Sequence, residues 1–331
     1  MPVKYWSSAG LMLTYWCNAS CASCYLCCGP GRQEEMSVED ALAYWRGLVE
    51  ASPHGCRIHL SGGEPFGNWP SLIEICRRAR REGLRPLQKV ETNAFWATDA
   101  AEVRDRLRAL NDAGMEKLVI SADPYHQQFV PIERCRLAAR IAEDLLGRAR
   151  VQVRWRDWLA DGRDTDTLTD AERAERFARY AAEGRDRLSG RAAELLGPLL
   201  SRKPAPDYAD NSCREGLLRS RHVHVGPEGR VYAGTCAGIV LGTLKRLDGG
   251  ALEPGVADIW RRLDADYADR PVVGTLVRHG PAGLLVEAEA CGFVAREGYA
   301  GKCQLCWELR RWLIRRGRHG DELGPAWMYE S

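Results

Sequence analysis

Residues 11–24 read Leu-Met-Leu-Thr-Tyr-Trp-Cys-Asn-Ala-Ser-Cys-Ala-Ser-Cys, an apolar run that ends in three cysteines. The apolar run predicts a buried strand, and Cys17, Cys21 and Cys24 follow it in Cys-x3-Cys-x2-Cys spacing. Three thiolates can hold three irons of a cubane cluster and leave the fourth iron open to a small molecule with an amine and a carboxylate. No other three cysteines between residues 17 and 28 have this spacing. The segment therefore predicts a reactive iron–sulfur site.

A glycine-rich element, Ser61-Gly62-Gly63-Glu64-Pro65, follows the next predicted strand. Together with the cysteine triplet before it, this element resembles the radical S-adenosylmethionine (SAM) superfamily. The resemblance implies a catalytic 4Fe-4S cluster on the three cysteines and SAM as a second cofactor. It also implies that the backbone at Gly62 and Gly63 binds the methionine amine, with Glu64 and Pro65 beside it, because a side chain there would block close approach.

Two other interpretations of these motifs stay open. Zinc or a redox disulfide would also use clustered thiols, although zinc prefers a closed set of four ligands, usually in pairs two residues apart. The glycine-rich element, taken alone, would also fit a plain turn between a strand and a helix. Both interpretations are less favoured because the two motifs occur together and in this order.

Composition and charge restrict the class of protein. The chain has 331 residues, 45% hydrophobic and 28% charged, enough for one large domain or two moderate ones. Its formal net charge of +2 gives no general attraction to nucleic acid or to membranes. The sequence shows no charged-then-apolar leader and no apolar run near the roughly 20 residues of a bilayer span. Thirteen cysteines without an export signal indicate thiols or metal ligands in a reducing compartment, so we expect a cytoplasmic protein.

Short apolar strands alternate with amphipathic helices as far as about residue 156. After the first strand their spacing is close to the roughly 30 residues of a strand with its crossover helix, which predicts a parallel sheet. Ser37 with Asp40 signals one helix start, and Asp99 signals another whose helix ends at Gly114. Right-handed crossovers would curl the sheet into a full or partial barrel with ligands at the carboxyl ends of its strands. The predicted strands are Leu11–Tyr15, Arg57–Leu60, Leu87–Thr92, Leu118–Ser121 and Val151–Trp155.

We therefore predict an α/β fold, a partial (β/α) barrel of parallel strands with a small C-terminal iron–sulfur domain made of a hairpin and a helix. The barrel is assigned to residues 1–160, a polar helical connector to 161–210 and the small domain to 211–331. The connector offers no sixth strand for the barrel. Within the small domain the predicted elements are the hairpin strands His222–Val225 and Arg230–Ala233 and the helix Leu305–Arg318.

Polar side chains follow the third, fourth and fifth predicted strands. Thr92-Asn93 and Ser121-x-Asp123 stand where the superfamily often places contacts to the ribose or the methionine carboxylate, and the resemblance implies that role here. A helix cap or a turn is the other interpretation of each pair. Arg154 either points into the barrel and binds a carboxylate or points outward. His126 follows a strand end and is the candidate catalytic acid or base, with a purely structural histidine as the alternative.

A second set of cysteines flanks the predicted hairpin and opens the last predicted helix; it comprises Cys213, Cys236, Cys303 and Cys306. The hairpin and the Cys-x2-Cys pair resemble the twitch subdomain, a shorter relative of the SPASM domain, and this implies an auxiliary 4Fe-4S cluster. Four thiolates would close such a cluster and suit electron transfer, while zinc is the alternative occupant. Cys291 is left over and could replace a ligand or act as a catalytic thiol.

The other cysteines lack partners at ligand spacing. Cys76 and Cys135 fall in predicted helices beside apolar residues and are interpreted as small buried hydrophobes. Cys27 and Cys28 lie close to the first site and are left without a role. The arginines of residues 310–316 would bind an anion or form a solvated face at a helix end.

These features predict a radical SAM enzyme that reductively cleaves SAM and abstracts a hydrogen atom from its substrate. Because an auxiliary cluster can accept a second electron, we expect net oxidation of a small metabolite, with flavodoxin or ferredoxin as electron donor. A peptide maturase that forms crosslinks or epimers with a separate leader-binding partner is the alternative, since 16 residues before the first ligand are too few to fold a leader-binding domain. A non-catalytic electron-transfer or zinc-binding protein is the rival from another class. No membrane or nucleic-acid partner is expected.

Overall fold

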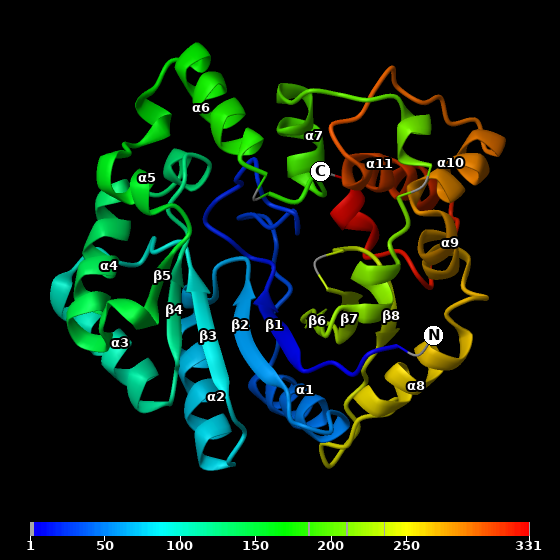
Figure 1. Ribbon diagram of the computed structural model, residues 1–331. Helices are drawn as coiled ribbons and strands as arrows, with labels where there is room; N and C mark the ends of the chain where they lie inside the picture. The colour runs from blue at the N-terminus through cyan, green and yellow to red at the C-terminus, as the bar shows by residue number, and fades with distance from the viewer. Residues whose placement is uncertain (1–2, 185, 210, 235, 331) are drawn as a thin grey trace.

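The computed structural model describes residues 3–184, 186–209, 211–234 and 236–330 (Figure 1). Within these residues the strands form one eight-stranded sheet in the order β5-β4-β3-β2-β1-β6-β7-β8. All neighbouring pairs from β5 to β6 are parallel, and the pairs β6–β7 and β7–β8 are antiparallel. The strands are β1 Ser8–Thr14, β2 Arg57–Gly62, β3 Leu87–Thr92, β4 Lys117–Ile120, β5 Val151–Val153, β6 His222–Val225, β7 Arg230–Ala233 and β8 Val240–Thr243.

Four helices provide the crossovers between the first five strands: α1 Val38–Ala51, α2 Trp69–Arg81, α3 Ala100–Asp112 and α4 Ile132–Leu146. Two of their starts are fixed as the sequence predicts. The Ser37 side chain accepts a hydrogen bond from the Asp40 N–H at 3.1 Å, and Asp99 caps α3 by accepting from the backbone of its first turn. In α1 the apolar residues at helical spacing, such as Leu42, Trp45 and Leu48, are buried.

The rest of the chain adds further helices, including a C-terminal helical group. In Figure 1 the last four helices gather beside β6, β7 and β8, while α1–α4 lie beside the other strands. Within the described residues, none of the helices is long and apolar enough to cross a bilayer. These helices are α5 Arg156–Asp161, α6 Asp170–Ala182, α7 Arg191–Leu195, α8 Val256–Asp266, α9 Pro271–His279, α10 Pro281–Ala290 and α11 Lys302–Ile314.

The hairpin at residues 222–233 extends the main sheet. β6 pairs in parallel with β1, with Gly10 opposite His224 and Leu11 opposite Val225. The sixth parallel strand, which residues 161–210 do not provide, therefore comes from the hairpin and lies on the side of β1 away from β2. β7 and β8 then continue the sheet beyond β6. The segment after residue 210 therefore shares one sheet with the segment before residue 160. Sequence pattern alone does not show this pairing, because it joins residues more than 200 positions apart.

The predicted α/β fold with parallel strands is confirmed. β3, β6 and β7 have the predicted bounds, and β1 begins three residues earlier, at Ser8. β5 is shorter than predicted because α5 begins at Arg156; Arg154 therefore stands just beyond the strand, although its N–H still bonds the Ile120 carbonyl at 3.0 Å. β8 was not predicted, since Gly242 interrupts its short apolar run.

Candidate cluster and cofactor sites

The cysteine triplet lies in the loop after β1. Backbone hydrogen bonds fasten this loop to the strand end, from the Cys17 N–H to the Gly29 carbonyl at 3.2 Å and from the Gly29 N–H to the Tyr15 carbonyl at 3.3 Å. Cys17 and Cys21 are buried, and Cys24 is half-buried. All three thiols line one cavity of about 150 Å³, so the structure brings together the residues that the spacing predicts as cluster ligands.

Arg191 and Cys28 support this loop from outside the triplet. Arg191, the first residue of α7, donates from Nε to the Cys21 carbonyl at 3.0 Å and also bonds the Cys28 carbonyl. A hydrogen bond from the Cys28 thiol lowers the pKa of Cys24 to about 5, which outweighs the effect of burial. Cys24 is thereby favoured in the thiolate form that binds iron, and Cys28, for which no role was predicted, lines the same cavity.

At Gly62 and Gly63 the backbone that ends β2 passes very close to the backbone that begins the cysteine loop. A Cβ on Gly62 would lie 2.4 Å from the Thr14 carbonyl oxygen, and one on Gly63 would lie 1.9 Å from the Trp16 carbonyl oxygen. The Gly63 N–H donates to Thr14 at 2.7 Å. Both glycines are therefore needed for backbone to approach backbone. They also line the cavity of the triplet, as the predicted cofactor role requires.

Glu64 is fully buried and binds the end of β3. Its carboxylate accepts hydrogen bonds from the Asn93 N–H at 2.6 Å, the Thr92 hydroxyl at 2.9 Å and the Phe66 N–H at 3.1 Å. Burial raises its pKa to about 7 in spite of these bonds. Glu64 thus acts on the cavity through Asn93, and Pro65 begins the short helical turn that follows.

Thr92 and Asn93 were predicted together as cofactor contacts, but their side chains make different contacts. The Thr92 hydroxyl accepts from the Ala94 N–H and the Trp96 indole, both at 3.0 Å, and so fixes the turn after β3. The Asn93 side chain lines the cavity, donating to the Asn18 side-chain oxygen at 2.8 Å with Cys17 Sγ 3.7 Å away. Asn93 therefore contacts the cysteine loop directly.

The buried Asp123 pairs with the half-buried His126 after β4. The Asp123 carboxylate accepts from the His126 Nδ1 at 2.8 Å and from the Tyr125 and His126 N–H groups at 3.0 and 2.9 Å. Burial alone would raise the pKa of Asp123, but His126 and Arg154 hold it well below its usual range. Although burial alone would lower it, the pKa of His126 is raised well above its usual value by Asp123 and Cys21, and the ring lines the cavity, as does Ser121. His126 therefore stands beside a predicted cluster ligand.

Arg154 points inward, one of the two orientations that the sequence allows. Its Nε lies 3.3 Å from Asp123 Oδ2, and its Nη2 bonds Asp186. Although burial alone would lower it, the pKa of Arg154 is raised by Asp123 and Asp186. The guanidinium lines the cavity of the triplet and also a second, larger cavity.

This larger cavity, of about 820 Å³, contains the second cysteine set. Cys213 precedes β6, Cys236 follows β7, and Cys303 and Cys306 lie in the first two turns of α11, which begins slightly earlier than predicted. Burial raises the pKa of Cys213 to about 12 and raises the pKa values of Cys303 and Cys306. Clustered buried thiols are a donor set that binds iron or zinc as thiolates.

The other predicted residues occupy separate places. Cys291 caps the C-terminal end of α10 and is not among the described residues that line either cavity. Cys76 and Cys135 are buried in α2 and α4, as expected. Within the arginine run, Arg310 is buried and donates to the Ala237 carbonyl at 2.8 Å and to the Tyr329 hydroxyl at 2.6 Å, so this residue is not on a solvated face.

Several lining residues were not predicted from the sequence. Ser23 and Tyr25 line both cavities, together with Arg154. Asp186 and Arg187 come from the segment interpreted as a polar connector, and the Arg187 guanidinium lies 3.5 Å from Cys236 Sγ. The charged residues between Gly184 and Gly190 were the available signal, because charges in a glycine-flanked loop suit a site better than a helix.

Comparison with known proteins gives similarity only among solved structures. No family model and no curated protein matches the chain. BtrN in complex with AdoMet and 2-DOIA is 17% identical, with a TM-score of 0.43, over 78% of this chain and 83% of that chain. Streptococcus suis SuiB bound to S-adenosylmethionine is 10% identical, with a TM-score of 0.35, over 70% and 61%. Native anSMEcpe with bound AdoMet and Cp18Cys peptide is 16% identical, with a TM-score of 0.32, over 44% and 42%.

Proposed function

We propose that this chain is a radical SAM enzyme with one auxiliary iron–sulfur cluster that oxidises a small metabolite. One observation carries the proposal. The three thiols at Cys-x3-Cys-x2-Cys spacing meet the carboxyl ends of the parallel strands in a single cavity, which Gly62, Gly63 and Asn93 also line. An electron-transfer protein would have no need of this further set of groups around its cluster.

The donor set fits a cluster with one open iron. Three cysteines face the cavity, and they leave one corner of a cubane without a protein ligand. The cluster and SAM together would supply the 5′-deoxyadenosyl radical that removes a hydrogen atom from the substrate. The chain's own part is to orient the cofactor, with Asn93 held by Glu64 and with Arg154 held by Asp123.

The second cysteine set supports net oxidation. Removal of one hydrogen atom leaves a substrate radical, and a product two hydrogens poorer forms when this radical gives up one proton and one electron. Cys213, Cys236, Cys303 and Cys306 would hold a fully ligated cluster that accepts the electron. Arg154, Ser23 and Tyr25 line both cavities, so the two proposed clusters would have a substrate space between them.

The larger cavity suits a small polar substrate. Its volume of about 820 Å³ is near the upper end of the roughly 300–1,000 Å³ of small-molecule sites, so a small molecule can lie beside the auxiliary cluster that the four cysteines would hold. Arg154, Arg187, Lys302 and Arg310 line it along with the acidic Asp186 and Glu215, so cationic groups outnumber anionic ones. We therefore propose a metabolite rich in hydroxyl, phosphate or carboxylate oxygens, and flavodoxin or ferredoxin as the electron donor in the cytoplasm.

The test is reductive cleavage of SAM. Protein reconstituted anaerobically with iron and sulfide is incubated with SAM and dithionite, and 5′-deoxyadenosine is quantified by chromatography. We expect its release at a rate that depends on the protein and on the reductant. Reconstituted protein that holds iron but releases no 5′-deoxyadenosine above the protein-free background would support the electron-carrier interpretation instead.

A further inference from the structure

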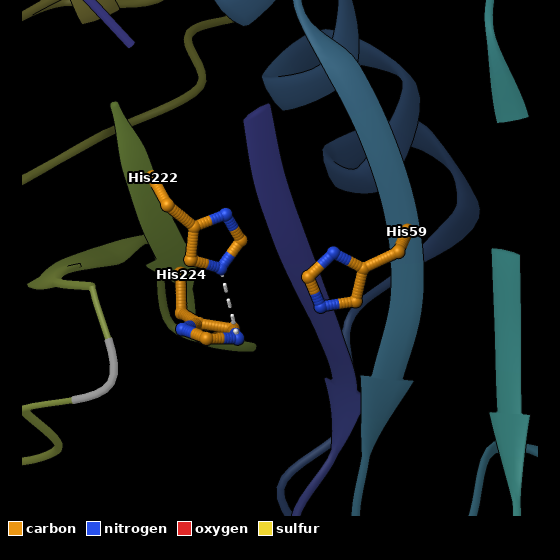
Figure 2. A group of neighbouring side chains, drawn as sticks. All are labelled: His59, His222 and His224. Atoms are coloured by element: carbon orange, nitrogen blue, oxygen red, sulfur yellow. Dashed lines mark hydrogen bonds between the residues drawn. The ribbon is translucent and has the colours of Figure 1, made fainter. Parts of the chain in front are cut away.

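Three histidines lie together beside β1, and none of them lines either of the cysteine cavities. His59 comes from β2, and His222 and His224 come from β6 (Figure 2). One ring nitrogen from each histidine lies within 4.8 Å of the other two. His59 and His224 are buried and His222 is half-buried, so this cluster belongs to the core.

The sheet register places these rings over β1. Gly10 of β1 pairs with His59 on one side and with His224 on the other, and Ser8 pairs with His222. Residues paired in this way point to the same face of the sheet. A Cβ on Gly10 would lie 2.4 Å from His224 Cδ2 and 2.5 Å from His59 Nε2. Glycine at this position therefore provides the space in which the two outer strands bring their histidines together.

Hydrogen bonds on the far side of two rings orient their remaining nitrogens. His224 Nδ1 lies 2.7 Å from the Gly234 carbonyl oxygen, which can only accept, so this nitrogen carries the proton and Nε2 presents a lone pair. His222 Nδ1 contacts the Ser8 hydroxyl at 2.9 Å, and its Nε2 faces His224 Nε2 at 3.5 Å. This is how metal-binding histidines are held, with the second nitrogen bonded to a carbonyl or a hydroxyl.

His59 lacks such a partner. Its Nδ1 is buried without a hydrogen bond among the described residues, and an unsatisfied buried polar nitrogen costs free energy. Burial holds the pKa of His59 well below its usual range and lowers the pKa of His222 to about 3. The rings are therefore neutral at physiological pH, the form in which imidazole binds metals.

We propose that His59, His222 and His224 bind one Zn²⁺ ion, which fastens β6 to β2 across β1. Nitrogens at about 2.0–2.1 Å from a tetrahedral Zn²⁺ lie about 3.3 Å apart, close to the 3.5 Å between the two facing Nε2 atoms. The His59 ring closes the remaining gap by rotation. Glu91, whose Oε1 lies 4.0 Å from His59 Nε2, adds a negative charge beside the site, although Lys89 pairs with it at 2.6 Å.

This site is independent of the proposed enzymatic function and involves none of the cysteines. Zn²⁺ suits it because imidazole is a preferred ligand and the site needs no redox chemistry, and a water molecule would take the fourth position, as in other zinc sites with three protein ligands. The ion would tie the C-terminal part of the sheet to its centre. Since binding to the folded state alone stabilises that state, loss of the ion should lower the unfolding temperature without altering the cluster ligands.

The experiment measures zinc and its ligands in the anaerobically purified holoprotein from zinc-supplemented culture. Elemental analysis should give about one zinc per chain. X-ray absorption at the zinc edge should show nitrogen neighbours at about 2.0–2.1 Å and lack the sulfur shell at about 2.3 Å that a cysteine site would give. Wild-type protein without zinc, or with zinc bound by sulfur, overturns the proposal whatever the variants do.

Variants locate the ion. His59→Gln and His222→Gln should each reduce zinc at least about tenfold while iron stays unchanged, since removal of one of three ligands abolishes a site of this kind. His54→Gln, at an exposed histidine, is the matched control and should retain zinc. Unchanged zinc in both His59→Gln and His222→Gln would disprove the assignment. Retained iron shows that a variant has folded.

Discussion

The Nε atom of Arg154, a residue that lines both cavities, lies 3.3 Å from Oδ2 of the fully buried Asp123. Asp123 is already bonded to His126, and Arg154 also bonds Asp186. The ion pair therefore joins the ends of β4 and β5 to the connector segment. Because both carboxylates are buried, their charges depend on Arg154 for compensation.

Removal of Arg154 should destabilise the fold strongly. Arg154→Met leaves Asp123 and Asp186 without their shared cation, and breaking a buried pair in this way costs about 3–5 kcal/mol. Urea denaturation under anaerobic conditions measures the loss in the free energy of unfolding. The double variant Arg154→Met/Asp186→Asn should lose less than the sum of the two single variants, because Asp186 no longer bears a charge. Strict additivity would show that the two residues do not interact.

Replacement of Cys17, Cys21 and Cys24 by alanine should remove one cluster. If both sites hold cubanes, reconstituted wild-type protein contains about eight irons per chain and the triple variant about four. Release of 5′-deoxyadenosine should cease. Cys76→Ala, at a buried helical cysteine, is the control and should keep both iron and cleavage. Undiminished release from the triple variant would refute the ligand assignment.

Replacement of Cys303 and Cys306 should separate cofactor cleavage from product formation. Iron should fall by about half, and slow 5′-deoxyadenosine release should persist because the first site is intact. Product should decrease more than 5′-deoxyadenosine, since the substrate radical loses its electron acceptor. Cys291→Ser should leave iron unchanged, because Cys291 does not line the cavity that holds the four cysteines. Stoichiometric zinc with iron unaffected by the double change would instead identify a zinc site.

The sequence predicted the local elements well. The bounds of β3 and of the hairpin strands, the caps at Ser37 and Asp99, and the meeting of Cys17 with Asn93 follow from short-range patterns and from the rule that parallel strands end at one edge. Such features are decided by neighbouring residues, so they can be predicted from the sequence.

The remaining features depend on contacts between distant segments. The pairing of β6 with β1 sets Gly10 between His59 and His224, yet nothing in the four residues of β6 indicates which strand they join. Glu64 shows the same limit: its motif does not indicate that its carboxylate binds the turn after β3. Side-chain direction within a buried turn is decided by packing, which local sequence does not show.

Glu64 should make stability depend on pH. Its pKa rises from 4.5 to about 7 on burial, so the folded state holds this proton more tightly than the unfolded state. The contribution of this proton to the free energy of unfolding is fully present below about pH 4.5 and is lost as the pH rises through about 7. At about 1.36 kcal/mol for each pKa unit, the loss is about 3 kcal/mol. The free energy of unfolding of wild type should therefore be lower at pH 8 than at pH 5, and that of Glu64→Gln should not show this decrease.

The control for this measurement is Glu50→Gln, at an exposed glutamate, which should keep the wild-type pH dependence. A wild-type protein that becomes more stable between pH 5 and pH 8 relative to Glu64→Gln would mean that the three hydrogen bonds to the carboxylate outweigh its burial.

His126 is predicted to accept the proton that accompanies oxidation. Because Asp123 and Cys21 raise its pKa in spite of burial, only the deprotonated ring can do so, and product formation should rise with pH. Its Nδ1 is held by Asp123, and the ring lines the cavity beside Cys21, so it can reach a substrate group that lies against the first cluster. His126→Gln should therefore slow product formation more than 5′-deoxyadenosine release. Asp123→Asn, which keeps the histidine and weakens its orientation, should give a smaller decrease of the same kind. An equal loss of both activities in His126→Gln would show that the histidine acts on the cluster through Cys21.

A substrate deuterated at the reacting carbon completes this test. For an oxidation, deuterium should appear in 5′-deoxyadenosine, one SAM should be consumed per turnover, and the product should be two hydrogens poorer than the substrate. Each hydrogen is then accounted for, one as the atom transferred to 5′-deoxyadenosine and one as the proton taken by His126. Deuterium returned from 5′-deoxyadenosine to the product, with SAM regenerated, would mean an isomerisation. In that case neither a base nor a second electron acceptor is needed, and the oxidative proposal would be wrong.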